Sequence, residues 1–281
     1  ANPVLRLLFL IFLTLLASAC ASTSRDAPPA PPPLAAIDGD YFRWESAALG
    51  RALHIYVKLP EGYDPAASYP AVYLTDGDSL YPLLAPTHLF LTYDEPVPPA
   101  IIIGIAYGSF DPEKGNRRGV DFRPPAADAP EGGAAAFQRF LADELIPEIE
   151  RRYRADPARR VLVGQSRGGA FVLYSAFTAP DLFWGRIASN ASLTPGEEIF
   201  FGPPPAAARD DLKLFYASGE RDRPDYRAPA LRWFDHWRAA PEKPWLVKTA
   251  TIENGVHAAS IGEAYRQGMV WLFEGSSAGA P

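Results

Sequence analysis

A pentapeptide in the second half of the chain, Gly164-Gln165-Ser166-Arg167-Gly168, has the Gly-x-Ser-x-Gly spacing of an activated serine. Three apolar residues at 161–163 precede it, and a helix-prone segment at 170–177 follows it. A strand, a tight turn and a helix in this order hold a serine hydroxyl exposed on a strained backbone. Glycine on both sides avoids the crowding that side chains would cause in the turn. The pattern therefore predicts Ser166 as a nucleophile.

A serine hydroxyl is a weak nucleophile at neutral pH and needs a general base, for which the chain offers four histidines. His54 lies inside a strand pattern, His88 precedes the inner strands of the sheet, and His236 lies in a helix beside two tryptophans. Only His257 lies in a loop after a late strand. We therefore predict His257 as the base.

A carboxylate that orients this histidine is expected between the serine and the histidine in the chain. Glu220, Asp222 and Asp225 all follow Gly219, which allows the chain to turn. Asp222 is the preferred acid because it lies in the loop proper. Glu220 and Asp225 remain alternatives, and all three charges would also be compatible with a solvated turn.

Two backbone N–H groups would complete such a site by binding the negative charge that develops during ester cleavage. One is expected from Arg167, directly after the serine. The second is expected from the loop after an earlier strand, at Asp78 or Gly77. The side chain of Arg167 is then free either to form an ion pair in the helix layer or to face an acidic substrate.

The elements that must position these residues alternate along the chain. Strands are predicted at 41–47, 51–60, 71–74, 100–106, 161–163, 185–190, 212–217 and 245–252. Helices are predicted at 79–91, 134–153 with a kink at Pro147, 170–177, 228–239 and 260–273. Residues 108–133 are predicted as one long loop. This alternation predicts an α/β fold, with one open, mostly parallel sheet covered by helices on both faces and catalytic groups at the carboxyl ends of its strands.

Composition excludes several other classes of protein. The 281 residues carry a net charge of −6, which argues against a broad nucleic-acid surface. A single cysteine, Cys20, excludes an internal disulfide and a cysteine metal cluster, and no metal or cofactor is predicted. The sequence leaves the oligomeric state open.

The first residues read as a targeting segment. The apolar run at 7–16 is short against the ~20 residues that a membrane-spanning helix needs. Ala17-Ser18-Ala19-Cys20 resembles a bacterial lipobox, which implies lipidation of Cys20 and a periplasm-facing place in the cell envelope, although Ala17 stands where leucine is usual. A plain secretory signal is the alternative. The predicted organisation is a signal peptide at 1–20, a Pro- and Ala-rich tether at 21–37, one domain at 38–275 and a tail at 276–281.

From about residue 59 to 273 the chain resembles the putative-esterase (esterase D-like) family of α/β-hydrolases, and especially its enterochelin esterase-like branch. The resemblance is carried by YPAVYLTDG at 69–77, RGVDFRP at 118–124, ELIPEIE at 144–150, GQSRGG at 164–169, GERD at 219–222 and GVH at 255–257. The chain departs from the family at Thr75, where leucine is common, and at 189–192, where Ser-Asn-Ala-Ser replaces the usual Ser-Pro-Ser and changes the expected pocket wall.

The resemblance implies the α/β-hydrolase fold and serine esterase chemistry on a small-molecule ester. It implies the roles already predicted for the nucleophile, the base and the acid, and it favours Asp78 as the oxyanion donor. It also implies that Arg118, Asp121 and their loop face the substrate.

The predicted function is hydrolysis of a carboxylic ester through an acyl-enzyme at Ser166. The branch implies ester bonds of catecholate siderophores, and a basic loop with Arg117, Arg118 and Arg123 suits an anionic substrate. Feruloyl esters and acylated carbohydrates are alternative substrates, and acyl transfer to an acceptor other than water uses the same intermediate. A non-catalytic envelope lipoprotein that binds its ligand is the alternative from a different class.

Overall fold

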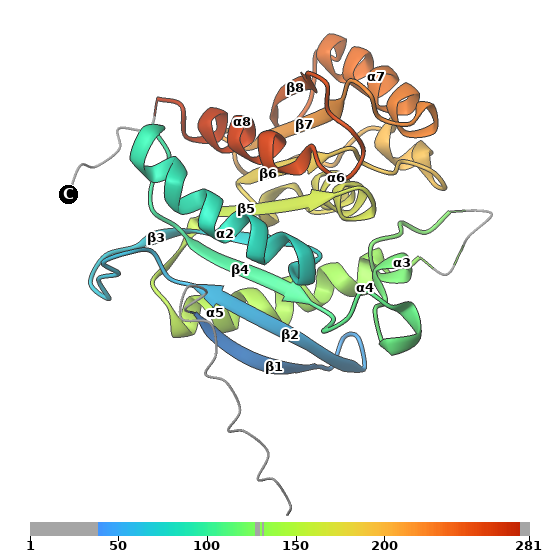
Figure 1. Ribbon diagram of the computed structural model, residues 1–281. Helices are drawn as coiled ribbons and strands as arrows, with labels where there is room; N and C mark the ends of the chain where they lie inside the picture. The colour runs from blue at the N-terminus through green and yellow to red at the C-terminus, as the bar shows by residue number, and fades with distance from the viewer. Residues whose placement is uncertain (1–38, 127–129, 131, 276–281) are drawn as a thin grey trace, which may run out of the picture. The chain divides into compact units, whose positions relative to one another are not determined.

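The computed structural model describes residues 39–126, 130 and 132–275 (Figure 1). The predicted signal peptide, Cys20, the tether at 21–37 and the tail at 276–281 lie outside the described residues and stay predictions. Within the described part, no helix combines the length and the apolar character needed to cross a bilayer.

Eight strands form one sheet, in the order β1-β2-β4-β3-β5-β6-β7-β8. They are β1 Asp40–Ser46, β2 Arg51–Lys58, β3 Tyr69–Leu74, β4 Ile101–Ala106, β5 Ala155–Gln165, β6 Gly185–Ser189, β7 Lys213–Gly219 and β8 Leu246–Ile252. Neighbours from β4 across to β8 are parallel, whereas β1 with β2 and β2 with β4 are antiparallel. The prediction of an α/β fold with a mostly parallel sheet is confirmed.

The side-chain pattern of each strand matches its place in the sheet. β4 is buried along its whole length, as a continuous apolar run between two strands requires. In β2, near the edge, Leu53, Ile55 and Val57 are fully buried and alternate with partly exposed neighbours. The continuous apolar run of β4 thus matches burial on both faces in the centre of the sheet. The alternation in β2 matches burial on one face near the edge.

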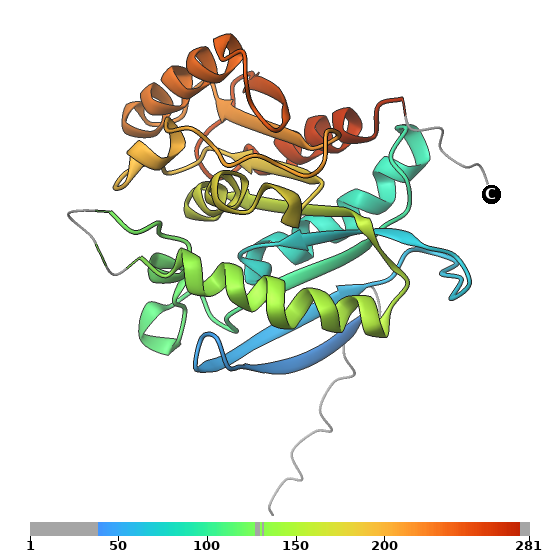
Figure 2. The same ribbon diagram turned by 180° about the vertical axis from the view of Figure 1, so that it is seen from behind.

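Helices cover both faces of the sheet (Figures 1 and 2). α2 Gly77–Asp94 and α8 Ile261–Phe273 pack on one face. The opposite face is covered by α4 Ala134–Arg139, α5 Ile146–Arg152, α6 Arg167–Thr178 and α7 Pro224–Ala239. Apolar side chains from each helix layer meet those of the sheet in two clusters, one on either face. The sheet is thereby enclosed, and its carboxyl edge is left for the loops.

Two predicted segments differ in detail from the structure. Residues 140–145 form a π-helical stretch between α4 and α5, and Pro147 lies in the first turn of α5. The backbone stays helical from α4 through this stretch into α5, so 134–152 is one helix, and the wider π turns lie directly before Pro147, which lacks the N–H of a regular α-helical turn. The predicted loop at 108–133 contains a 3₁₀ turn at Pro112–Lys114 and the short helix α3 at Arg118–Asp121.

A buried arginine secures the far end of the helix that follows Ser166. Arg186 of β6 is fully buried and donates to the carbonyls of Ala179 at 2.8 Å, Pro180 at 3.0 Å and Phe183 at 2.8 Å. It also contacts Ser175 near the end of α6. Burial lowers the pKa of Arg186 to about 9, which leaves it charged at neutral pH. Its donors hold the segment from Ala179 to Phe183, which follows the end of α6, against β6.

Candidate active site

Ser166 sits on the tight turn between β5 and α6, with φ 57° and ψ −115°. A residue other than glycine rarely adopts this backbone conformation, and strain of this kind persists where the surroundings enforce it. A Cβ on Gly164 would overlap the carbonyl oxygen of Gly168, and one on Gly168 would overlap the hydroxyl of Thr75. The two glycines thus permit the close approach that the sequence pattern predicted.

The serine, the histidine and the carboxylate predicted from separate parts of the chain lie in one hydrogen-bonded series. Ser166 Oγ lies 2.9 Å from His257 Nε2, and His257 Nδ1 lies 2.8 Å from Asp222 Oδ1. The carboxylate accepts a hydrogen bond from Nδ1–H, so Nε2 is left to accept a hydrogen bond from the serine hydroxyl. The Asp222 side chain is fully buried and that of His257 is 24% exposed. The series therefore runs from the interior to the surface.

The two alternative acids lie elsewhere. Glu220 accepts from the backbone N–H of Asn254 at 2.9 Å, and Asp225 forms an exposed ion pair with Arg223 at 2.6 Å. The structure thus places Asp222, rather than Glu220 or Asp225, against the imidazole.

The other three histidines have structural surroundings. His54 lies 2.8 Å from the hydroxyl of Tyr41, and His236 lies on α7. His88 is buried in α2, where its Nδ1 lies 2.8 Å from the hydroxyl of Tyr265. Burial lowers the pKa of His88 to about 4. These positions agree with the choice of His257 as the base, which the sequence analysis reached by setting aside the other three histidines.

The predicted oxyanion donors lie at the starts of two helices. Arg167 is the first residue of α6 and Asp78 the second of α2, directly after Gly77. Backbone amides of a first helical turn lack intrahelical acceptors and lie at the positive end of the helix dipole. The carboxylate of Asp78 accepts from the amides of Tyr107 at 2.7 Å and Gly108 at 2.8 Å, which holds the start of α2 against the end of β4. Both Asp78 and Gly77 remain possible donors.

Arg118 supports this turn from the side. Its Nε and Nη2 donate to the two carboxylate oxygens of Asp76 at 2.6 and 3.0 Å. Asp76 has φ 52° and immediately precedes α2. Burial alone would lower the pKa of Arg118, but the hydrogen bonds to Asp76 outweigh it and hold that pKa above its usual value. The guanidinium of Arg118 is therefore already paired with a carboxylate of the protein, that of Asp76.

Asp121 corrects a prediction. It was expected to face the substrate, but it is only 3% exposed. Its carboxylate accepts from the hydroxyl of Tyr107 at 2.8 Å and forms an ion pair with Arg51. Because Tyr107 and Arg51 both belong to the protein, the carboxylate of Asp121 links the loop to the sheet and does not face a ligand.

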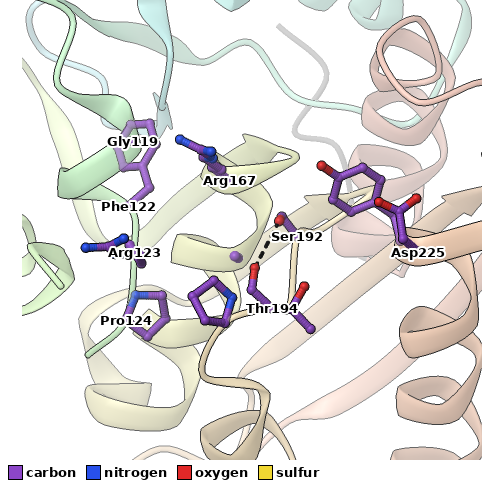
Figure 3. Close-up of a pocket in the computed structure, with 11 residues that line it drawn as sticks. Gly119, Phe122, Arg123, Pro124, Arg167, Ser192, Thr194 and Asp225 are labelled. Carbon is purple, nitrogen blue, oxygen red and sulfur yellow. Dashed lines mark hydrogen bonds between the residues drawn. The ribbon is translucent and has the colours of Figure 1, made fainter. Parts of the chain in front are cut away.

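A cavity of about 230 Å³ lies beside Arg167, the residue that follows Ser166 (Figure 3). It is lined by residues that include Phe122, Arg123, Arg167, Ser192, Thr194 and Tyr226. The amide of Ser192 donates to the carbonyl of Ser166 at 3.0 Å, and the ring of Tyr226 stacks on His257. The cavity is therefore in place to hold part of a substrate that reacts at Ser166.

The cavity has a cationic wall. The side chain of Arg167 lines the cavity, where a Cβ on Gly119 would come within 2.7 Å of its Nη1. Among the residues that the structure describes, no carboxylate forms an ion pair with Arg167 or Arg123, and the Nε of Arg123 is buried without a hydrogen-bond partner. Asp225 also lines the cavity but is paired with Arg223. Of the two orientations that the sequence left open for Arg167, the structure shows the one toward the cavity.

Sequence reasoning missed Tyr226, because the predicted helix began at 228 whereas α7 begins at Pro224. Proline in a first helical turn was the available signal. Within the described ranges, no group of three or more His, Cys, Asp or Glu side chains is arranged to hold a metal ion.

Comparison with known proteins agrees with the predicted family. A family model described as "Putative esterase" matches residues 46–274. Ferri-bacillibactin esterase BesA of Bacillus subtilis (strain 168) is 36% identical over 159 residues, 51% of this chain and 54% of that protein. Apo-salmochelin esterase of Escherichia coli O6:H1 (strain CFT073) is 27% identical over 179 residues, 58% of this chain and 56% of that protein. The chain thus spans about half the length of the curated relatives it matches.

Solved structures share the fold. The crystal structure of BES protein from Bacillus cereus has a TM-score of 0.73 and 22% identity, covering 83% of this chain and 94% of that one. This likeness confirms the predicted α/β-hydrolase fold. Because the family model spans most of the chain and these two relatives are named as bacillibactin and salmochelin esterases, the chain belongs to the putative esterase family, in its enterochelin esterase-like branch.

Proposed function

We propose that the protein is a serine esterase that cleaves a carboxylic ester through an acyl-enzyme at Ser166. The observation that carries this proposal is the series from Ser166 Oγ to His257 Nε2 at 2.9 Å and from His257 Nδ1 to Asp222 Oδ1 at 2.8 Å. A protein that only binds its ligand needs neither this series nor a strained serine at the head of a helix.

In the first half of the reaction, Ser166 Oγ attacks the ester carbon while its proton passes to His257 Nε2. The carbonyl oxygen becomes negative and is bound by the amide of Arg167 and by that of Asp78 or Gly77. Asp222 stabilises the imidazolium. The carbon–oxygen bond to the alcohol then breaks, and the imidazolium gives its proton to the departing oxygen.

In the second half, water takes the place of the alcohol. His257 removes a proton from water, the hydroxyl attacks the acyl carbon, and the bond to Ser166 Oγ breaks as that oxygen recovers its proton. The imidazole is 24% exposed, so water has access to it. We therefore favour hydrolysis over transfer to another acceptor.

The substrate that we propose is an ester of a catecholate siderophore. Two relatives carry such activities in their names, ferri-bacillibactin esterase and apo-salmochelin esterase. Arg123 and Arg167 line the cavity and form no ion pair with a carboxylate in the described part of the chain, which suits an anionic, aromatic acyl group, because guanidinium both pairs with anions and stacks on rings. Feruloyl and acylated-carbohydrate esters are the alternatives to be tested.

The decisive experiment measures hydrolysis by the wild type and by Ser166→Ala. Short p-nitrophenyl esters report the chemistry, and siderophore trilactones, feruloyl esters and acetylated sugars report the substrate. Loss of the nucleophile in such a series costs about 10⁶ in kcat. Wild-type turnover by a folded Ser166→Ala variant would contradict the nucleophile, and no hydrolysis of any ester by the wild type would favour a binding protein.

The cationic wall has its own test. Arg123→Gln and Arg167→Gln each remove one charge, and Arg167→Gln keeps its backbone amide. We expect each to raise KM at least several-fold for a catecholate ester and to leave KM for neutral p-nitrophenyl acetate nearly unchanged. Equal effects on both substrates would contradict a role in anion binding.

We also propose that the mature protein is anchored in the cell envelope by a lipid on Cys20 and faces the periplasm. Support comes from the lipobox-like Ala17-Ser18-Ala19-Cys20 after an apolar run. Cells fed a labelled fatty acid should yield labelled wild type in the membrane fraction, and Cys20→Ser should lose the label. A labelled Cys20→Ser protein, or an unlabelled wild type, would contradict the anchor.

A further inference from the structure

Asn190 stands directly after β6, between the strand that carries the serine and the strand that carries the acid. It is 1% exposed and has φ 44°, in the left-handed region. It belongs to the segment at 189–192 that departs from the family pattern. Apart from glycine, asparagine is among the few residues that adopt this backbone conformation readily.

The side-chain amide of Asn190 joins the base loop to the acid loop. Its Nδ2 donates to the carbonyl oxygen of His257 at 2.7 Å and to that of Val256 at 3.2 Å. Its Oδ1 accepts from the amide of Gly219, the last residue of β7, at 2.7 Å. One short side chain therefore contacts the backbone of the base and the start of the turn that leads to Asp222.

The carbonyl of His257 receives a second side-chain donor, Nε2 of Gln165, from the residue before the nucleophile. Two side chains at the ends of β5 and β6, those of Gln165 and Asn190, thus meet at the carbonyl of His257, and Asn190 is bonded in turn to Gly219 of β7. A backbone bond from Arg221 to Gly255 at 2.8 Å also joins the two loops, but Asn190 makes the link at His257 itself.

We propose that Asn190 is a positioning residue for the proposed esterase reaction, holding the backbone of His257 so that its imidazole stays aligned between Ser166 and Asp222. This inference rests on the proposed function.

The loop needs such a link because most of the residues around the histidine, from Glu253 to Ala259, are at least partly exposed. The imidazole itself is braced by stacking on Tyr226. Displacement of a reacting group by about 1 Å can cost ~10²-fold in rate. Asparagine supplies a donor, an acceptor and a tolerated left-handed backbone at once, and each property is used here.

The competing explanation is that the segment only shapes the cavity. Ser192 and Thr194 line the cavity, and the amide of Ser192 is bonded to the carbonyl of Ser166. A pocket-wall role for Asn190 would appear in KM, whereas misalignment of the base appears in kcat.

The test compares Asn190→Asp and Asn190→Gly with the wild type on p-nitrophenyl acetate. Asn190→Asp keeps the size and the acceptor for Gly219 but turns an oxygen toward two carbonyl oxygens. Asn190→Gly keeps the left-handed backbone and removes the side chain. We expect kcat to fall by ~10- to 100-fold in both, with KM within about twofold. The matched control is Asn254→Gly, an exposed asparagine with φ 53° in the same loop, which should keep wild-type kcat.

A second readout does not depend on activity. Hydrogen exchange of residues 253–260, measured by mass spectrometry, should be faster in Asn190→Gly than in the wild type and unchanged in segments remote from it. The inference is overturned by unchanged exchange, by unchanged kcat in folded variants, or by an effect confined to KM. An inactive wild-type protein would instead contradict the proposed function, and the exchange measurement would still decide whether Asn190 holds the loop.

Discussion

The ring of Tyr226 lies against the imidazole of His257, with ring centroids 4.3 Å apart and planes inclined by 22°. The guanidinium of Arg223 covers the Tyr226 ring at 4.5 Å. Tyr226 comes from the first turn of α7, so the start of this helix braces a side chain that arrives from the loop after β8. The same tyrosine lines the cavity, which links the base to the acyl site.

Removing this ring should slow the reaction. A stacked aromatic pair is worth about 1 kcal/mol, which corresponds to roughly fivefold in rate if the brace acts in the transition state. We expect Tyr226→Ala to lower kcat/KM by about that factor, and Tyr226→Phe, which keeps the ring, to stay near wild type. A matching loss in Tyr226→Phe would point to the hydroxyl instead.

Substitution of the acid should reveal which carboxylate orients His257. Asp222→Asn keeps the shape but loses the charge that stabilises the imidazolium, and in a comparable site this change costs about 10⁴ in kcat. We expect a loss of ~10³- to 10⁴-fold, with Glu220→Gln and Asp225→Asn within a few-fold of wild type. Steady-state kinetics on p-nitrophenyl butyrate measures these losses. Near-normal activity of Asp222→Asn would show that another carboxylate orients His257.

Stability should fall in mild acid because of His88. Its Nε2 lies 3.0 Å from the carbonyl of Pro98, which can only accept, so the neutral ring donates there and accepts from Tyr265. The folded pKa of about 4 lies below the ~6.5 of an unfolded histidine. Between these values the unfolded chain binds the extra proton, so stability is lost as the pH falls through this window.

The low pKa of His88 in the folded protein should reduce the free energy of unfolding by about 2 kcal/mol between pH 7 and pH 5. Urea unfolding at both pH values should show this loss in the wild type and a smaller one in His88→Gln. His236→Gln, at an exposed position, serves as the control and should keep the wild-type pH dependence. An identical dependence in all three proteins would show that His88 is not the group responsible.

Arg186 should matter for stability rather than chemistry. Arg186→Met would leave three carbonyls, those of Ala179, Pro180 and Phe183, without this donor in a buried site. The carbonyl of Ala179 keeps the amide of Leu182 as a donor, so two carbonyls become unsatisfied; at ~1–3 kcal/mol for each buried group, we expect a loss of at least ~2 kcal/mol in urea unfolding. Arg139→Met, at an exposed helix position, should be nearly neutral. A small loss in Arg186→Met would mean that water or a shifted backbone replaces the guanidinium.

The sequence predicted the elements best where one local rule governs them. The alternation in β2 and the apolar run of β4 follow from strand burial, and the glycines around Ser166 follow from the shape of one turn. His257 was selected because so few histidines compete for the role. Pro147 indicated a disturbance inside the helix at 134–153, but the sequence did not show that it takes the form of a π-helical stretch at 140–145.

By itself, then, the amino-acid sequence determined the strand–turn–helix around Ser166, the order of serine, acid and base, and the sheet that must bring them together. The tertiary structure decided which polar side chains point at ligand and which at protein. Arg118 pairs with Asp76, and Asp121 pairs with Tyr107 and Arg51, whereas Arg123 and Arg167 line the cavity. Asn190 and Tyr226 reach His257 across long stretches of chain. Such partnerships depend on side-chain directions set by packing between distant elements, and no local pattern encodes them.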